Sequence, residues 1–225
     1  MNQRRINKQN NFYYMTGALV VLLLSASLAK SLMGGMLESL LEGVIAITFL
    51  VCVISLGVDK SWKRFMQVLI VIWLLTAISK RFVTIPHLDL FMLGLMFAFF
   101  WGTFSSIAKQ VLFSGAVSGN QVVGSIALFL LLGLMWALVY LLILALSPNA
   151  FSGIEHSAWG QNFSQMAYFS FVTLTTLGYG DISPNTPFAQ VAVYMEAIAG
   201  VFYMAIVVAS LVSAGLAQKS TQQEG

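Results

Sequence analysis

The chain has 225 residues, of which 59% are apolar and only 8% are charged. Its mean hydropathy is +0.86. Soluble domains carry about 25% charged residues, so this composition excludes a soluble globular protein and indicates one embedded in a membrane. The net charge of +3 comes from basic residues scattered along the chain, which favours a role in membrane topology over nucleic-acid binding.

Long apolar runs, bounded by charged or turn residues, predict six membrane helices. In chain order they cover residues 15–32, 41–58, 65–79, 88–113, 122–146 and 188–217. Since about 20 apolar residues cross a bilayer, six spans use most of the chain and exclude a large catalytic or nucleotide-binding domain. The first run follows basic residues, as in a signal peptide, but no small-residue cleavage site follows it. We therefore expect it to remain as the first helix.

The basic residues also predict the orientation of the chain. Eight of them fall at the two termini or in the second and fourth connections, and three fall on the opposite side. Because cytoplasmic segments carry the excess of Lys and Arg, we expect both termini in the cytoplasm. The expected location is a cell membrane, either a plasma membrane or a bacterial inner membrane. The polar interval 147–187 then faces outward.

The most informative segment is Thr-Leu-Thr-Thr-Leu-Gly-Tyr-Gly-Asp at residues 173–181. Glycines at alternate positions, Gly178 and Gly180, allow positive φ angles, so an extended strand can turn successive carbonyl groups to one side. Several copies around an axis would form oxygen cages that replace the water shell of a monovalent cation. Non-helical backbone at membrane depth is costly unless it lines a polar cavity. The segment therefore predicts an ion filter.

Thr176 to Asp181 resemble the potassium-channel signature Thr-Val-Gly-Tyr-Gly-Asp, with Leu177 in place of the usual valine. The resemblance covers residues 122–217 and implies the pore module of that family, with an outer helix, a re-entrant pore helix, a filter and an inner helix. It implies K⁺ as the permeant ion, no other cofactor, and a homotetramer, because the family's filter uses four chains. The residues implied to coordinate K⁺ through backbone oxygens are Thr176, Leu177, Gly178, Tyr179 and Gly180, with Thr176 also using its hydroxyl.

The residues around the motif fit this resemblance. Residues 164–175 have the length of a helix that crosses part of the bilayer, and Asn162 or Ser164 are candidate N-caps. Tyr168 and Phe169 match the family's aromatic cuff around the filter. Some family members have an acid behind the filter where this chain has Val172, so we expect the Tyr168 hydroxyl to hold Asp181 instead. The residues expected to support the filter are Tyr168, Phe169, Thr175, Asp181 and Glu196.

The last apolar run contains two residues of interest. Gly200 matches the position of a hinge glycine in the family, although a glycine there can instead permit close helix packing. Glu196 is the one ionisable residue well inside the run. We expect it to hydrogen-bond the back of the pore helix, with ion coordination or pH sensing as the alternative.

In the register set by Gly200, one face of the last run would point at the pore and form a hydrophobic gate. Contact with the protein core or with lipid is the alternative for each member of this face. The residues concerned are Val201, Met204, Val208 and Val212.

The first four runs predict a peripheral domain rather than a voltage sensor. The fourth run holds Asp89 and Lys109 at its ends and no arginine, whereas voltage sensing needs several charges that cross the field. The expected organisation is a cytoplasmic segment 1–14, a four-helix domain 15–121, a pore domain 122–217 and a cytoplasmic tail 218–225.

The sequence therefore predicts an all-α membrane protein with six transmembrane helices, and a re-entrant pore helix and filter between the fifth and sixth. The expected function is passive, potassium-selective conduction, with K⁺, membrane lipid and three further copies of the chain as partners. No motif points to an enzyme or to nucleic-acid binding. Two alternatives remain: a non-conducting regulatory subunit, and an ion-transporter subunit with a filter-like loop.

Overall fold

The computed structural model describes residues 10–32, 37–57, 59–82, 87–112, 118–155, 157 and 159–209. The first four helices are α1 (Asn11–Leu32), α2 (Leu37–Ser55), α3 (Lys60–Ser79) and α4 (Leu88–Leu112). They are followed by α5 (Gly119–Leu146), α6 (Trp159–Leu174) and α7 (Pro187–Tyr203), and α7 continues into a π-helical turn at Met204–Val208. β1 (Phe151–Ser152) and β2 (Ser183–Pro184) form a short antiparallel pair.

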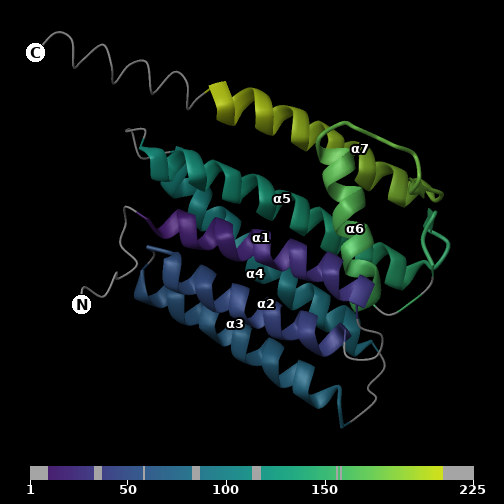
Figure 1. Ribbon diagram of the computed structural model, residues 1–225, viewed down its shortest axis with the longest axis horizontal. Helices are drawn as coiled ribbons and strands as arrows, with labels where there is room; N and C mark the ends of the chain where they lie inside the picture. Colours follow the sequence, from purple (N-terminus) through teal and green to yellow (C-terminus); the bar gives the residue numbers. More distant parts are fainter. Residues whose placement is uncertain are drawn as a thin grey trace, which may run out of the picture.

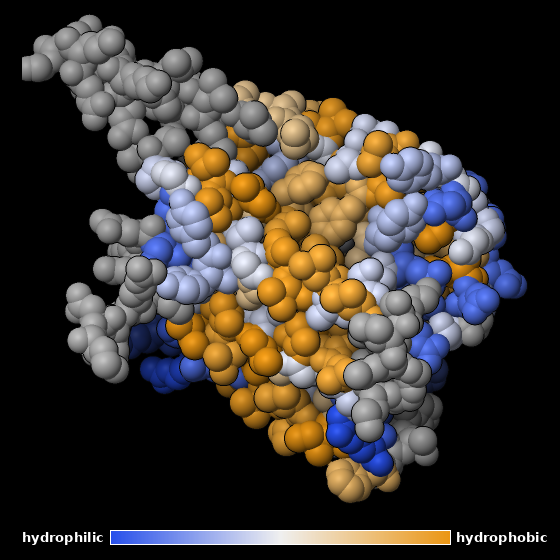
Figure 2. Space-filling model, in the orientation of Figure 1, coloured by the Kyte–Doolittle hydropathy of each residue, from blue (hydrophilic) through white to orange (hydrophobic). Residues whose placement is uncertain are grey.

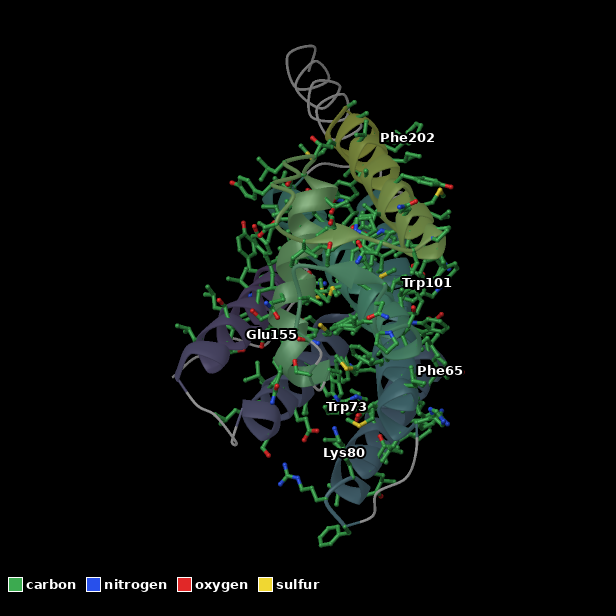
Figure 3. The ribbon with its side chains drawn as sticks, turned by 90° about the vertical axis from the view of Figure 1, so that its right-hand side faces the viewer. Phe65, Trp73, Lys80, Trp101, Glu155 and Phe202 are labelled. Atoms are coloured by element: carbon green, nitrogen blue, oxygen red, sulfur yellow. The ribbon has the colours of Figure 1, made fainter. Side chains whose placement is uncertain are left out.

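The helices make this a multi-pass membrane protein. α1, α3, α4, α5 and α7 with its π-helical turn are long and apolar enough to cross a bilayer, and the apolar part of α2 is slightly shorter, at Ser39–Ser55. Figure 2 shows an apolar middle and hydrophilic ends on the visible face. Phe65, Trp101 and Phe202, on α3, α4 and α7, are exposed along one side of the molecule (Figure 3). Large exposed apolar side chains of this kind are expected to face lipid or another subunit.

The α-helices pack in an order that leaves α6 at one end. α1 lies against α2 and α5, and α4 lies between α3 and α5. α6 packs against both α5 and α7 and crosses them steeply near the end where α5 finishes (Figure 1). The start of α1 is fixed to the start of α5, because Asn120 donates to the side-chain oxygen of Asn11 at 2.8 Å.

A helix occurs in each of the six predicted apolar runs, but several helices begin earlier than predicted. α1 begins at Asn11 instead of residue 15, and α3 begins at Lys60 instead of residue 65. The reason is that hydropathy detects the apolar middle of a helix, whereas the helix itself begins at its cap. At α5 that cap is a capping box formed by Ser118 and Gln121. The predicted continuation of the last run beyond residue 209 lies outside the described residues.

Two further predictions need correction. α6 begins at Trp159, five residues before the expected start, so neither Asn162 nor Ser164 is its N-cap. Asn162 lies inside the first turn, where its amide donates to the backbone oxygens of Glu155 and Ser157. The prediction of an all-α protein also missed β1 and β2, which are two residues long and therefore leave no alternating pattern in the sequence.

Candidate functional site

The chain leaves α6 after Leu174, and residues 176–181, which belong to no helix or sheet, form the segment that we call the filter strand. Its φ angles are positive at every second residue: +61° at Thr176, +56° at Gly178 and +80° at Gly180. Leu177 and Tyr179 between them have ordinary φ angles. An alternation of this kind allows successive carbonyl groups to face one side, which is the arrangement expected from the two glycines.

Thr176 was not expected to share this conformation. A positive φ is unusual for a β-branched residue, because its side chain crowds the backbone. The residue lies two positions before Gly178, which itself lies two before Gly180, so the period of two could have revealed it. The filter strand therefore begins one step earlier than the glycines alone indicate.

The amide groups at the start of the filter strand point back to α6. Thr176 N–H donates to Thr173 O at 2.9 Å, and Leu177 N–H donates to Val172 O at 2.9 Å. Gly178 N–H also reaches Val172 O, at 3.3 Å. No described residue donates a hydrogen bond to the carbonyl groups of Thr176 to Gly180. These oxygens and the side chains beside them are exposed in the single chain, with Leu177 at 60% and Tyr179 at 67%.

Tyr168 holds the outer end of the filter strand. Its hydroxyl donates to Asp181 Oδ2 at 2.8 Å, so the expected hydrogen bond between these side chains is confirmed. Phe169, the next residue, packs against other aromatic rings. Its ring lies 5.1 Å from the ring of Tyr140 and 5.7 Å from that of Phe151.

The segment after Asp181 is tied to the segment after α5. β1 pairs with β2, and Asn185 N–H donates to Ala150 O at 2.8 Å. Gly153 has a φ of +79°, and a Cβ atom there would lie 1.9 Å from Asp181 O. This close approach is possible only because residue 153 has no side chain.

Glu196 joins three helices behind the filter strand. Its carboxylate is fully buried and accepts hydrogen bonds from Tyr140 on α5 and from Ser170 on α6, the latter at 2.5 Å. The predicted hydrogen bond between Glu196 and the back of the pore helix is therefore confirmed. Ser170 Oγ also lies 2.7 Å from Gly133 O. At Gly133 the ring of Phe171 occupies the place of a side chain, 2.5 Å from an ideal Cβ, so α6 packs closely on α5.

Gly200 lies against the end of α6. A Cβ atom at residue 200 would be 2.1 Å from Leu174 O, so the close-packing reading of this glycine has direct geometric support. The hinge reading stays a prediction. The π-helical turn begins four residues later, at Met204.

A cavity of about 640 Å³ lies beside the inner end of the filter strand. Thr175 and Thr176 line it from the filter side, Val201 lines it from α7, and Met204 lines it from the π-helical turn. The Thr175 hydroxyl donates to Phe171 O at 2.6 Å, which leaves its methyl group as the freer part of the side chain. The side chain of Val208 and the whole of Val212 lie outside the described residues, so the predicted gate is described only at its first two members.

Comparison with known proteins gives one match. A family model described as Ion channel matches residues 126–216. The matched part runs from α5 through α6 and the filter strand to α7 and beyond, which is less than half of the chain. No curated protein and no solved structure matches the chain significantly. Residues 126–216 are therefore similar to an ion-channel domain, a family that is not an enzyme class, and the similarity is consistent with ion conduction.

Proposed function

We propose that the chain is one subunit of a potassium-selective channel that conducts K⁺ passively across a cell membrane. The observation that carries the proposal is the alternation of positive φ at Thr176, Gly178 and Gly180. It allows a row of peptide oxygens, none of which accepts a hydrogen bond from a described residue, to face one side, and such oxygens can replace the hydration shell of K⁺. Thr176, Leu177, Gly178, Tyr179 and Gly180 are the proposed coordinating residues.

A single filter strand cannot enclose an ion, so the proposal requires several copies around one axis. Four copies would match the potassium-channel filter that residues 176–181 resemble. The exposure of Leu177 and Tyr179 in the single chain supports this assembly, since both would face neighbouring subunits there. α1 to α5 and α7 are the proposed six spans, with α6 as a pore helix that crosses part of the bilayer.

The distribution of basic residues supports an orientation with both termini in the cytoplasm. At the end of α3, Lys80 pairs with Asp89 at 2.7 Å, and Arg81 lies 3.6 Å from Glu42. At the opposite end, Lys60, Lys63, Arg64 and Lys109 form no ion pair with a described residue. Cytoplasmic segments carry the excess of Lys and Arg, so the end with these four basic residues, where α5 begins, is the proposed cytoplasmic side.

The test is ion flux into liposomes that contain the purified protein. We expect K⁺ to move down its gradient without nucleotide or a coupling ion, and Na⁺ to be excluded. Flux that needs a second ion would instead indicate a transporter subunit. No flux from a folded tetramer would indicate a regulatory subunit, and equal Na⁺ and K⁺ flux would contradict the selectivity.

A substitution in the filter strand tests the proposal at a single residue. Gly178→Ala places a side chain on a residue with a φ of +56°, which costs about 1–2 kcal/mol in each subunit, and we expect it to abolish K⁺ flux. Gly94→Ala is the matched control, because no atom lies within 4 Å of its ideal Cβ and its φ is helical. The control should conduct like the unmodified protein.

A further inference from the structure

α7 is fixed to neighbouring helices as far as Tyr203 and changes its helical form directly after it. Gly200 lies against the end of α6. The Tyr203 hydroxyl donates to Ser125 O on α5, and the Tyr203 ring lies 5.3 Å from the ring of Phe129. At Met204 the α-helix gives way to the π-helical turn, which lies towards the end of the molecule where α5 begins (Figure 1). Tyr203 is therefore the last residue in the described part of this helix whose side chain is hydrogen-bonded to another helix.

The π-helical turn is not imposed by its own sequence. Residues 201–209 contain neither proline nor glycine, the residues that most often interrupt a helix. The turn also makes few contacts with elements other than α7, and Met204 and Ile206 are 55% and 59% exposed in the single chain. The same residues can therefore form an ordinary α-helical turn. π-helical turns inside α-helices are frequent at functional sites, so we examined what the exchange of the two forms would do.

Two residues four positions apart stabilise the π-helical form. Tyr203 is hydrogen-bonded to α5, and Val207 is only 7% exposed. In an α-helix, residues four apart are offset by about 40° around the axis. The wider π-helical turn brings them closer to one line, so that both side chains can face the protein. Loss of the Tyr203 hydrogen bond would remove one of these two anchors and favour the α-helical form.

The form of the turn decides which residue comes next on the face that lines the cavity beside the filter strand. Val201, Met204 and Ala205 lie on this face. In a continuous α-helix, position 208 shares the face of Val201, because seven residues make about two turns. A π-helical turn holds about one residue more than an α-helical turn, which brings position 209 to this face instead. Ala209 is exposed in the structure, as this register requires.

We propose that the end of α7 exchanges a π-helical for an α-helical turn at Met204–Val208, and that this exchange places either Ala209 or Val208 at the pore. The hydrogen bond from Tyr203 to Ser125 O favours the π-helical form. The proposal rests on the proposed channel function and specifies how conduction is controlled. Valine side chains, one from each subunit, make a narrower and more apolar ring than alanine side chains, and hydrophobic constrictions close a pore by dewetting. The π-helical form is therefore the conducting form.

The test measures which of the two positions meets water. Cys52 is buried and is the single cysteine of the sequence, so Cys52→Ala gives a background without thiols. Ala209→Cys and Val208→Cys are introduced separately, and the protein in liposomes is exposed on both sides to a permanently charged thiol reagent. Intact-mass spectrometry measures the rate of modification. We expect Ala209→Cys to react about tenfold faster than Val208→Cys, because the reagent needs a thiolate in contact with water.

Two further positions calibrate the reaction. Val201→Cys lies on the cavity wall and should react fast. Val207→Cys lies at a buried position and should react slowly. These two rates set the range within which the rates at positions 208 and 209 are compared.

A substitution at Tyr203 tests the hydrogen bond. Tyr203→Phe removes the hydroxyl and keeps the ring that packs against Phe129. It should lower the ratio of the Ala209→Cys rate to the Val208→Cys rate about fivefold. K⁺ flux should fall with it, because position 208 would face the pore more often. Ser125→Ala is the matched control, since the acceptor is the backbone oxygen of residue 125, and both its rate ratio and its flux should be unchanged.

Three results would overturn the proposal: a Val208→Cys rate that equals or exceeds the Ala209→Cys rate, a rate ratio that Tyr203→Phe does not change, or K⁺ flux that does not fall in Tyr203→Phe. K⁺-selective flux together with any of them counts only against the turn. Absent or unselective flux together with the expected thiol rates counts only against the proposed function. Protection of every position, Val201→Cys included, would exclude a water-filled path and overturn both.

Discussion

Thr176 has a backbone conformation that threonine rarely adopts, at the point where the filter strand begins. Its φ of +61° costs of order 1–3 kcal/mol, and the surrounding hydrogen bonds must compensate. Those bonds are made by its own N–H to Thr173 O and by the next N–H to Val172 O. The end of α6 thus supplies the acceptors that hold the strained residue, which explains why the filter strand starts directly after a helix.

At the outer end of the filter strand, the Tyr168 hydroxyl alone donates a hydrogen bond to the Asp181 side chain among the described residues. Tyr168→Phe removes the donor to Asp181 and changes little else, because Tyr168 is 41% exposed. We expect the mean open time of single channels to fall roughly two- to threefold, since Asp181 loses the hydrogen bond that holds it against α6. Single-channel recording in planar bilayers measures this.

The matched control is Tyr194→Phe, which removes a hydroxyl that is exposed on α7 and has no hydrogen bond with a described residue. Its open time should be unchanged. Equal open times in Tyr168→Phe and the unmodified protein would mean that the hydrogen bond to Asp181 does not support the filter.

Among the helices, α5, α6 and α7 are joined by one carboxylate. Glu196 on α7 accepts from Tyr140 and Ser170, so its removal would leave two buried hydroxyl groups without that acceptor. We expect Glu196→Ala to lower the free energy of unfolding by about 3 kcal/mol. Chemical denaturation in detergent, followed by tryptophan fluorescence, measures the change.

Glu196→Gln should be much milder. Its amide can accept from Tyr140 and donate to Ser170, while Ser170 donates to Gly133 O, which lies 2.7 Å away. The control Glu155→Ala, at an exposed position, should leave stability unchanged. If Glu196→Ala were as stable as that control, the three helices would not depend on this carboxylate.

The sequence predicts these elements unevenly, for physical reasons. The length of each apolar run correctly predicted a helix there, because crossing a bilayer requires a fixed number of apolar residues. It misplaced the start of α6, because Asn162 acts from inside the helix rather than as its cap. The partner of Asp181 was predictable from Val172, which leaves no acid behind the filter. The pairing of Tyr140 with Glu196 was not, since the sequence gives no distance between two helices.

For the whole molecule, α1 to α4 meet the segment that matches the ion-channel model at several defined places. α4 packs along α5 of the same chain. Lys80, at the end of α3, pairs with Asp89 on α4 and lies 5.9 Å above the ring of Trp159, the first residue of α6. Movement of the first four helices would therefore reach α5 through its interfaces with α1 and α4, and α6 through Lys80 and through its contacts with α1 and α2.

The same arrangement predicts weak dependence of channel opening on voltage. Each charge that crosses the field contributes about 2.3 kcal/mol per 100 mV, but α4 carries its charges only near its ends, at Asp89 and Lys109. We expect the open probability in planar bilayers to be nearly constant over about 200 mV. One full charge that crossed the field would instead change the balance of open and closed channels by about 4.6 kcal/mol over that range, which is more than a thousandfold. A steep rise in open probability would show that another charged element moves through the membrane.

The contact between Gly153 and Asp181 has a consequence for how this protein can evolve. Residue 153 is exposed, and surface loops usually accept many amino acids. Here any side chain would collide with the peptide bond at the mouth of the filter. In a saturation-mutagenesis library selected for growth on limiting potassium, all replacements at this site should disappear as completely as those at Gly178, so that a surface loop carries one of the strictest sequence requirements in the chain.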